Sequence, residues 1–279
     1  MERVYTFGSS AKLVGILTDG KSLQSSHVLP IILLLNAGLV HRVGPHRLHV
    51  YLARELSSLG FSVFRFDLSG IGDSNRHKDD RSREDQILSD IQEAMAFLAT
   101  LINKNKFIVM GLCTGADNSH KISLKDERVT GAVFLDGYCY PTAGYYLRRY
   151  GPKLLSPKAW SRFSKKMFKK IAGIIKANYE TNVYDTRQDN YFWTLPPIHK
   201  AEKEIKQLVD RGVKLLYVFS DGFMCNYRDQ FFECFKTVDF RKKVQVEFIK
   251  NSQHNYPISA NREKLIGAIS QWLKTYFIK

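Results

Sequence analysis

Continuous apolar runs alternate with segments of helical periodicity along most of the chain. The runs lie at 28–35, 61–66, 107–110, 129–135, 213–219 and 244–249, after a predicted hairpin of short strands at 4–7 and 12–17. The run at 28–35 has no polar alternation, which is typical of a strand buried on both faces of a parallel sheet. Apolar residues at helical spacing predict helices at about 46–58, 83–101, 201–211, 229–235 and 261–277. This rhythm predicts an α/β fold with a mostly parallel, doubly wound sheet, whose ligands lie beyond the carboxyl ends of the strands.

The alternation is interrupted at 138–200. From 137 to 179 the chain has ten basic residues and no acidic one, so about two thirds of the net charge of +15 lies there. Ser156 and Pro157 are a good N-cap and N1 pair. The apolar residues that follow recur at helical spacing, with lysines largely on the other faces: Trp160, Phe163, Met167, Ile171 and Ile174. We therefore expect a helical, basic lid at 138–200, inserted into a core formed by 1–137 and 201–279.

The composition argues against several classes of protein. The longest apolar run is far shorter than the roughly 20 residues needed to span a bilayer, and Met1-Glu2-Arg3-Val4 does not begin an apolar signal segment. The four cysteines have no CxxC spacing, which argues against a zinc site and a disulfide framework: Cys113, Cys139, Cys225 and Cys234. We expect a cytoplasmic protein with reduced thiols, no cofactor and no metal site.

The candidate nucleophile is Cys113, in the segment Gly111-Leu112-Cys113-Thr114-Gly115. An apolar strand that ends in this pattern and passes into a helix has the form of a nucleophile elbow, with cysteine where the common G-x-S-x-G pattern has serine. The tight turn holds its central residue in a strained conformation and crowds the positions on either side, so glycine is needed there. A thiol at a helix N-terminus is also favoured in its anionic form.

A thiol nucleophile needs a base, and His254 lies in the loop between the last predicted strand and the last helix. Asp221 closes the preceding strand, so the order nucleophile, acid, histidine runs along the chain as in α/β hydrolases. The histidine would take the thiol proton, and the carboxylate would orient the ring and support its protonated form. Asp221 is the preferred acid, with Asp136 and Asp229 as alternatives.

An oxyanion hole needs two backbone donors close to the nucleophile. The N–H of Thr114 is one candidate, because this residue follows Cys113. The other would come from the small-residue turn after the strand at 28–35, where Gly38 and Leu39 lie. Asp117, one turn into the helix after Cys113, is a further polar candidate that could tune the thiolate or bind an amine, or make only a structural contact.

The chain resembles the α/β hydrolases over nearly its whole length outside the lid. The segments Arg42-Val43-Gly44-Pro45-His46-Arg47 and Gly70-Ile71-Gly72-Asp73-Ser74 are similar to the serine-aminopeptidase-like hydrolases that accompany exosortase systems. This resemblance implies an α/β-hydrolase fold and a hydrolase activity. The chain differs from those relatives in having Ala37 and Leu39 for a glycine and a proline, and Cys113 for the usual serine.

These features favour an acyl hydrolase or acyltransferase that works through an acyl-Cys113 intermediate on a thioester. The exchange of one thioester for another keeps the acyl group activated, and a hydrophobic lid would exclude water. An acidic acyl carrier protein is a candidate partner for the basic lid, and we expect no nucleic acid. The alternatives are a hydrolase of small esters, lactones or peptides, and a non-catalytic protein that binds a partner through its lid.

Overall fold

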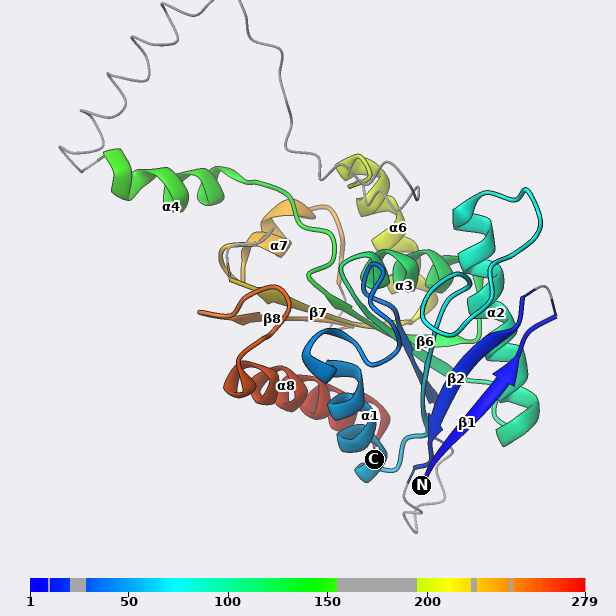
Figure 1. The fold of residues 1–279 in the computed structure, drawn as a ribbon. Coiled ribbons are helices and arrows are strands. Elements are labelled where there is room, and N and C mark those ends of the chain that lie inside the picture. Colours follow the sequence, from blue (N-terminus) through cyan, green and yellow to red (C-terminus); the bar gives the residue numbers. More distant parts are fainter. Residues whose placement is uncertain (10, 21–28, 155–194, 222–224, 241–242, 279) are drawn as a thin grey trace, which may run out of the picture.

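The computed structural model describes residues 1–9, 11–20, 29–154, 195–221, 225–240 and 243–278. Eight strands form one sheet in the order β1-β2-β4-β3-β5-β6-β7-β8 (Figure 1). The strands are β1 (Glu2–Phe7), β2 (Leu13–Thr18), β3 (Ile31–Leu35), β4 (Val63–Phe66), β5 (Phe107–Leu112), β6 (Val129–Leu135), β7 (Lys214–Ser220) and β8 (Val244–Ile249). The helices are η1 (Pro45–Arg47), α1 (Leu48–Ser58), α2 (Arg83–Ile102), α3 (Thr114–Lys125), α4 (Ala143–Leu154), α6 (Ile198–Arg211), α7 (Gln230–Cys234) and α8 (Ser259–Phe277).

The sheet is parallel from β4 to β8 and antiparallel at one end. β2 pairs with β1 and with β4 in antiparallel fashion, so the predicted N-terminal hairpin extends the edge of the sheet. The remaining neighbours pair in parallel. All five residues of β3 and all six of β5 are buried, which explains why their sequences have no polar alternation.

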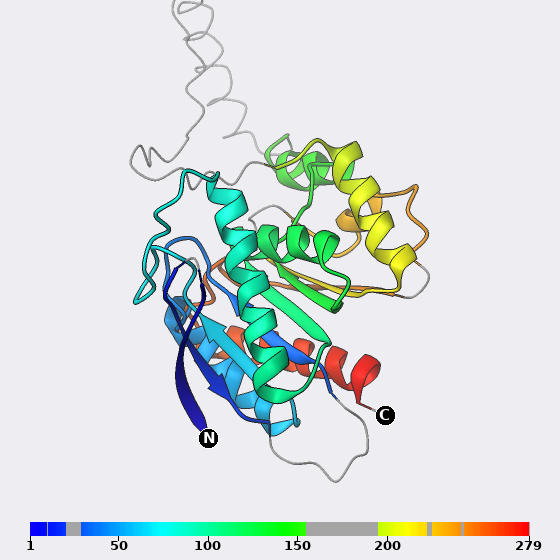
Figure 2. The same cartoon turned by 90° about the vertical axis from the view of Figure 1, so that its right-hand side faces the viewer.

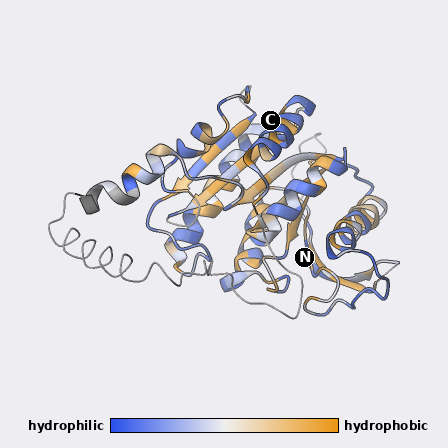
Figure 3. Cartoon of the chain, turned by 90° about the horizontal axis from the view of Figure 1, so that it is seen from above, coloured by the Kyte–Doolittle hydropathy of each residue, from blue (hydrophilic) through white to orange (hydrophobic). Residues whose placement is uncertain are grey.

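Helices cover both faces of this sheet (Figures 1 and 2). One apolar cluster joins the sheet to α2, α3, α6 and α7. A second cluster on the opposite face joins it to α1 and α8. Seen from above, apolar residues concentrate in the strands between more polar helices (Figure 3). The chain therefore has the doubly wound α/β fold that its sequence predicts, and the carboxyl ends of the parallel strands form one edge.

The predicted elements differ from the observed ones mainly at their ends. The helix expected at 46–58 begins only at Leu48 as α1, because His46 and Arg47 have positive φ angles of 48° and 61° and belong to the preceding tight turn. The apolar lid helix expected after Ser156 lies outside the described residues. The described parts of the 138–200 segment include α4 and the start of α6. None of the helices within the described ranges is both long and apolar enough to cross a bilayer.

Candidate active site

Cys113 lies between the last residue of β5 and the first of α3, at the carboxyl edge of the sheet. Its φ of 58° and ψ of −117° are unusual for a residue with a side chain, as expected of a nucleophile elbow. The flanking glycines are required by close contacts. A Cβ on Gly111 would lie 2.2 Å from the backbone of Gly115, and a Cβ on Gly115 would lie 2.7 Å from the carbonyl oxygen of Asn36. The elbow is therefore packed directly on the end of β3.

His254 reaches this elbow from the loop between β8 and α8, and its partner is Asp136. The ring nitrogen Nδ1 of His254 lies 2.6 Å from Oδ2 of Asp136. Asp136 is fully buried and is itself fixed, because its carboxylate accepts hydrogen bonds from the N–H of Ser220 at 2.6 Å and from the Ser220 hydroxyl at 2.7 Å. The carboxylate thus has a single orientation toward the imidazole.

The environment of His254 favours the protonated imidazole. Burial, the largest single influence, lowers the pKa of His254, whereas hydrogen bonds with Asp136 and with the side chain of Cys113, and the charges of both groups, raise it. The net effect raises the pKa of His254 from 6.5 to about 9. The ring is therefore protonated at neutral pH, with the carboxylate of Asp136 and the side chain of Cys113 as its partners.

Asp221, the preferred acid from the sequence, binds the backbone of the loop that carries His254, whereas Asp136 binds the ring. Its carboxylate accepts a hydrogen bond from the N–H of Asn251 at 2.9 Å, and its own N–H donates to the carbonyl of Ser252 at 3.2 Å. Asp221 thus holds the loop that carries His254, and Asp136 takes the place expected for the acid. Asp229, the other alternative, lies just before α7.

The reason lies in the order of the strands. β6 is the neighbour of β5, whereas β7 is one strand farther from the elbow. The N–H of Cys113 donates to the carbonyl of Leu135 at 3.0 Å, so the residue after Leu135 lies beside Cys113. That residue is Asp136, whose φ of 51° turns the chain at the end of β6.

The turn after β3 contacts the residue that follows Cys113. The N–H of Gly38 donates a hydrogen bond to Oγ1 of Thr114 at 2.7 Å. Gly38 has a φ of 56°, and the turn is closed by a hydrogen bond from the N–H of Val40 to the carbonyl of Ala37 at 3.0 Å. Leu39, at the tip, is 58% exposed. The structure therefore brings the three predicted oxyanion-hole residues to the elbow, with the Gly38 N–H bonded to a side chain.

An ion pair that sequence reasoning missed supports this turn. The backbone N–H of Arg42 donates to Oδ1 of Asp67 at 2.5 Å, and its guanidinium binds the same carboxylate and that of Asp73, the latter at 2.6 Å. Asp67 is fully buried. The side chain of Asn36 also binds this region, donating to the carbonyl of Val40 at 2.9 Å. The two segments that resemble known hydrolases, 42–47 and 70–74, are thus joined by this ion pair. Their resemblance to the same family was the feature of the sequence that could have indicated the contact.

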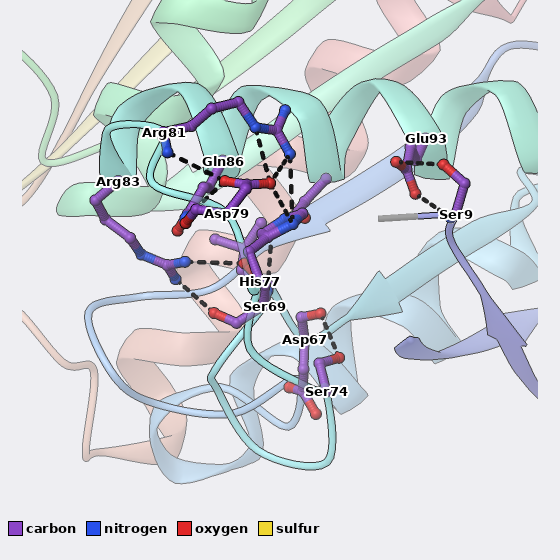
Figure 4. A network of polar contacts seen from close by, with 12 residues as sticks. Ser9, Asp67, Ser69, Ser74, His77, Asp79, Arg81, Arg83, Gln86 and Glu93 are labelled. Atoms are coloured by element: carbon purple, nitrogen blue, oxygen red, sulfur yellow. Dashed lines mark hydrogen bonds and ion pairs between the residues drawn. The ribbon is translucent and has the colours of Figure 1, made fainter. Parts of the chain in front are cut away.

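A second buried polar network holds the loop between β4 and α2 (Figure 4). His77 lies 2.7 Å from Asp90, and the same carboxylate accepts the N–H of Ser69 at 2.8 Å. The guanidinium of Arg83 donates to the carbonyl of Ser69 at 2.7 Å and to its hydroxyl at 2.9 Å. The side chains of His77 and Asp90 are each only 1% exposed. This buried histidine and aspartate therefore fasten the loop.

A cavity of about 450 Å³ lies beside α3. It is lined by residues of α2, α3, the segment after β6 and the start of α6: Glu84, Asp117, Lys121, Leu124, Lys125, Tyr138, Leu195, Pro196, Pro197, Lys200 and Glu204. Asp117 accepts a hydrogen bond from the hydroxyl of Tyr138 and lies 3.0 Å from Nζ of Lys121. Asp117 thus has protein partners for its charge. These contacts support a structural role for Asp117 over the alternatives of tuning the thiolate or binding an amine.

The remaining thiols are distinct from Cys113. All four cysteines are free, and Cys113 is partly accessible, whereas the other three are buried. The thiol of Cys225 donates to the carbonyl oxygen of Tyr227 at 3.0 Å, and that of Cys234 to the carbonyl oxygen of Tyr140 at 3.1 Å. Within the described ranges, no group of three or more histidine, cysteine or acidic side chains is arranged to hold a metal ion.

Comparisons with known proteins show the family and the fold of the chain. A model of the family described as serine aminopeptidase, S33, matches residues 38–193, more than half of the chain. A local match of 61 residues is 46% identical to the lysophosphatidylserine lipase ABHD12 of Danio rerio. It covers 22% of this chain and only 15% of that protein.

Solved structures match over nearly the whole chain. The α/β hydrolase GrgF from Penicillium sp. sh18 has a TM-score of 0.61 at 13% identity, covering 100% of this chain and 99% of GrgF. The proline iminopeptidase of Mycobacterium smegmatis has a TM-score of 0.62 at 11% identity, covering 98% of each chain. The esterase Pf2001 of Pyrococcus furiosus has a TM-score of 0.60 at 13% identity, covering 100% of this chain and 93% of the esterase. At these identities the matches show a shared fold.

Proposed function

Because this chain belongs to the serine aminopeptidase S33 family of α/β hydrolases, we propose that it is an acyl hydrolase or acyltransferase whose nucleophile is Cys113. The observation that carries the proposal is the chain of contacts from Cys113 through His254 to the buried Asp136. These three groups have the roles that covalent acyl transfer requires: a nucleophile, a proton carrier and a group that orients the carrier. The expected substrate is a thioester.

In the first half of the reaction, the thiolate of Cys113 attacks the carbonyl carbon of the substrate, and the carbonyl electron pair moves onto oxygen. When this intermediate collapses, the bond to the substrate sulfur breaks, and the leaving thiolate takes the proton from His254. The product is a free thiol and an acyl-Cys113 thioester. Asp136 keeps Nδ1 of His254 protonated and so directs the other ring nitrogen toward the reacting atoms.

In the second half, an acceptor attacks the acyl-Cys113 carbonyl while His254 takes its proton. The acceptor is water in a hydrolase, or an amine or hydroxyl in a transferase. Collapse of this intermediate releases the acylated acceptor, or the free acid, and restores the thiolate beside the imidazolium. A cysteine nucleophile suits transfer, because acyl-Cys113 remains an activated thioester and an amine attacks it more readily than an oxygen ester.

The basic segment after β6 favours an anionic carrier of the acyl group. Ten basic and no acidic residues lie between 137 and 179, which would attract an acidic acyl carrier protein electrostatically. Such attraction acts mainly on the rate of encounter and weakens with salt. Thioester turnover that falls steeply with ionic strength for a carrier-bound substrate, but not for the same acyl group on a small thiol, would support this partner.

Intact-protein mass spectrometry after incubation with acetyl, butyryl and octanoyl thioesters of N-acetylcysteamine tests the proposal. We expect an acyl mass on the wild type and none on Cys113→Ala. An acyl mass on Cys113→Ala equal to that on the wild type, or no adduct and no thiol release by the wild type, would refute the nucleophile. Adding glycine or hydroxylamine to the acylated protein would separate transfer from hydrolysis by the product that appears.

A second candidate function is hydrolysis of oxygen esters. The local identity to a lysophosphatidylserine lipase and the shared fold with an esterase favour it. The same site would serve, with water as the only acceptor. Turnover of p-nitrophenyl esters that exceeds thioester turnover by the same preparation, and that is lost in Cys113→Ala, would select this function. Salt-sensitive binding of a partner without reactivity toward either ester class would instead support a non-catalytic protein.

A further inference from the structure

The side chain of Thr114 links the nucleophile elbow to the turn after β3. Its Oγ1 accepts the N–H of Gly38 at 2.7 Å, which joins positions 76 residues apart in the chain. A threonine hydroxyl can accept two hydrogen bonds and donate one. The contact with Gly38 uses an acceptor position, so the hydroxyl proton remains available to donate. Thr114 also immediately follows Cys113, which places this proton on the residue next to the reacting sulfur.

This contact changes the expected composition of the oxyanion hole. The N–H of Gly38, one of the two candidates for the single donor expected from the turn, donates to the Thr114 hydroxyl in this structure. The N–H of Thr114 lies in the first turn of α3, where backbone donors have no acceptor within the helix. A hydroxyl that accepts from a backbone N–H is polarised and becomes a better donor. Thr114 thus offers two donors, its backbone N–H and its hydroxyl, and the hydroxyl is the one that accepts the N–H of Gly38.

The space beside Gly38 is compatible with a substrate carbonyl. A Cβ built on Gly38 would meet no atom within 4 Å, so this position needs glycine for its φ of 56° and not for lack of room. By contrast, Gly115 on the other side of Thr114 is packed against the carbonyl of Asn36. There is therefore open space beside Gly38, whereas the elbow is closed on its Gly115 side.

We propose that the hydroxyl of Thr114 is a catalytic oxyanion donor, polarised by the N–H of Gly38 and acting together with the backbone N–H of Thr114. The inference rests on the proposed acyl transfer through Cys113. When the sulfur bonds to the substrate carbonyl carbon, the carbonyl electron pair moves to oxygen. That oxygen accepts the hydrogen bond from the Thr114 hydroxyl, without transfer of the proton, until collapse expels the leaving thiolate, which is protonated by His254.

The test compares Thr114→Val, which keeps the branched shape and loses the hydroxyl, with Thr114→Ser, which keeps the hydroxyl. Two rates are measured for each: acylation of Cys113 by butyryl-N-acetylcysteamine, and alkylation of Cys113 by iodoacetamide. Alkylation displaces iodide at a saturated carbon and creates no oxyanion, so it reports only on the thiolate, on His254 and on an intact elbow. It therefore serves as the folding and reactivity control within the same variants.

We expect Thr114→Val to acylate about 10²-fold more slowly than the wild type, the usual effect of losing one oxyanion donor. Its alkylation rate should stay within about 3-fold, and Thr114→Ser should stay within about 5-fold on both rates. Equal acylation by Thr114→Val and the wild type would overturn the inference alone. The inference would also be overturned if acylation and alkylation fell together in Thr114→Val, or if Thr114→Val and Thr114→Ser lost acylation equally. Faster acylation by Thr114→Val than by the wild type would overturn it as well. A wild type that forms no acyl-Cys113 would overturn the proposed function and this inference with it.

Discussion

Replacing Asp136 by Asn should remove the charge that keeps His254 protonated. The asparagine has nearly the same shape, and its Oδ1 can still accept the N–H of Ser220, so the packing at the end of β6 is largely kept. Its amide can only donate toward Nδ1 of His254, which reverses the polarity of that hydrogen bond. An amide N–H₂ in the place of Oδ2 cannot accept the proton on Nδ1 of His254. The protonated ring would therefore lose both this hydrogen bond and the attraction of the negative carboxylate.

The magnitude follows from the pKa of His254. A rise from 6.5 to about 9 corresponds to about 3.4 kcal/mol in favour of the protonated ring, at about 1.36 kcal/mol for each pKa unit. Asp136 and Cys113 share this effect, and the ring is 23% exposed. We therefore assign about 2 kcal/mol to Asp136, after allowing for solvent screening, which is about 30-fold in an equilibrium between charged and neutral rings.

The assay is the rate of alkylation of Cys113 by iodoacetamide between pH 6 and pH 10. For Asp136→Asn we expect the histidine inflection to shift from about 9 down by about 1.5 pH units, so that the protonated fraction, and with it the rate, falls about 2-fold at pH 7.5 and about 8-fold at pH 8.5. Asp221→Asn is the matched control, because its carboxylate accepts an N–H from Asn251 in the histidine loop, whereas Asp136 binds the ring. Its rate should stay within about 2-fold.

The reasoning would be refuted if Asp221→Asn produced the slow rate and the shifted inflection while Asp136→Asn behaved as the wild type. It would also fail if both variants were unaffected, since His254 would then be protonated by something other than its observed partner. Thermal unfolding of both variants, followed by circular dichroism, checks that neither change acts through loss of the fold.

Three further predictions concern stability. Because the folded pKa of His254 is about 9 against 6.5 when unfolded, its stabilising contribution is complete below pH 6.5 and is lost as the pH rises through 9. The loss should be about 3 kcal/mol in urea unfolding, and parallel pH profiles of the wild type and His254→Gln would contradict this. Gly115→Ala should lower the free energy of unfolding by about 1–3 kcal/mol and slow acylation, since its Cβ would meet a backbone carbonyl 2.7 Å away. Gly267→Ala in α8, with nothing within 4 Å, should be neutral or stabilising by up to about 1 kcal/mol. If Gly267→Ala unfolded at a lower temperature than Gly115→Ala, the contacts described at the elbow would be contradicted. Arg42→Met should cost about 3 kcal/mol by leaving the buried Asp67 without its cation, and a chemical denaturation midpoint equal to that of the wild type would show that the ion pair is not needed.

Much of the fold was predictable because it depends on local patterns. The buried strands β3, β5 and β6 read as continuous apolar runs, and the observed strands confirm them. The elbow was equally local, since two glycines around one cysteine at a strand end require the tight turn that the structure contains. The order of β7, β8 and α8 also placed His254 at the correct edge of the sheet, because parallel strands share their carboxyl ends.

The sequence did not predict which carboxylate binds His254, because this depends on which strand lies next to β5. Asp221 and Asp136 both follow a buried strand, and chain order alone favoured Asp221. The neighbour of β5 is β6, so Asp136 lies beside Cys113 and Asp221 holds the histidine loop instead.

The sequence by itself determined the kind of sheet, the strained position of Cys113 and the chemical types that meet near it, since apolar periodicity and glycine placement act over a few residues. Only the tertiary structure decided which of several suitable groups touch: Asp136 with His254, Gly38 with Thr114, and Arg42 with Asp67. Each of these contacts joins residues at least 25 positions apart. The order of the strands and the packing of the elbow on β3 determine which residues meet in these contacts. Neither feature produces a periodic pattern in the amino-acid sequence.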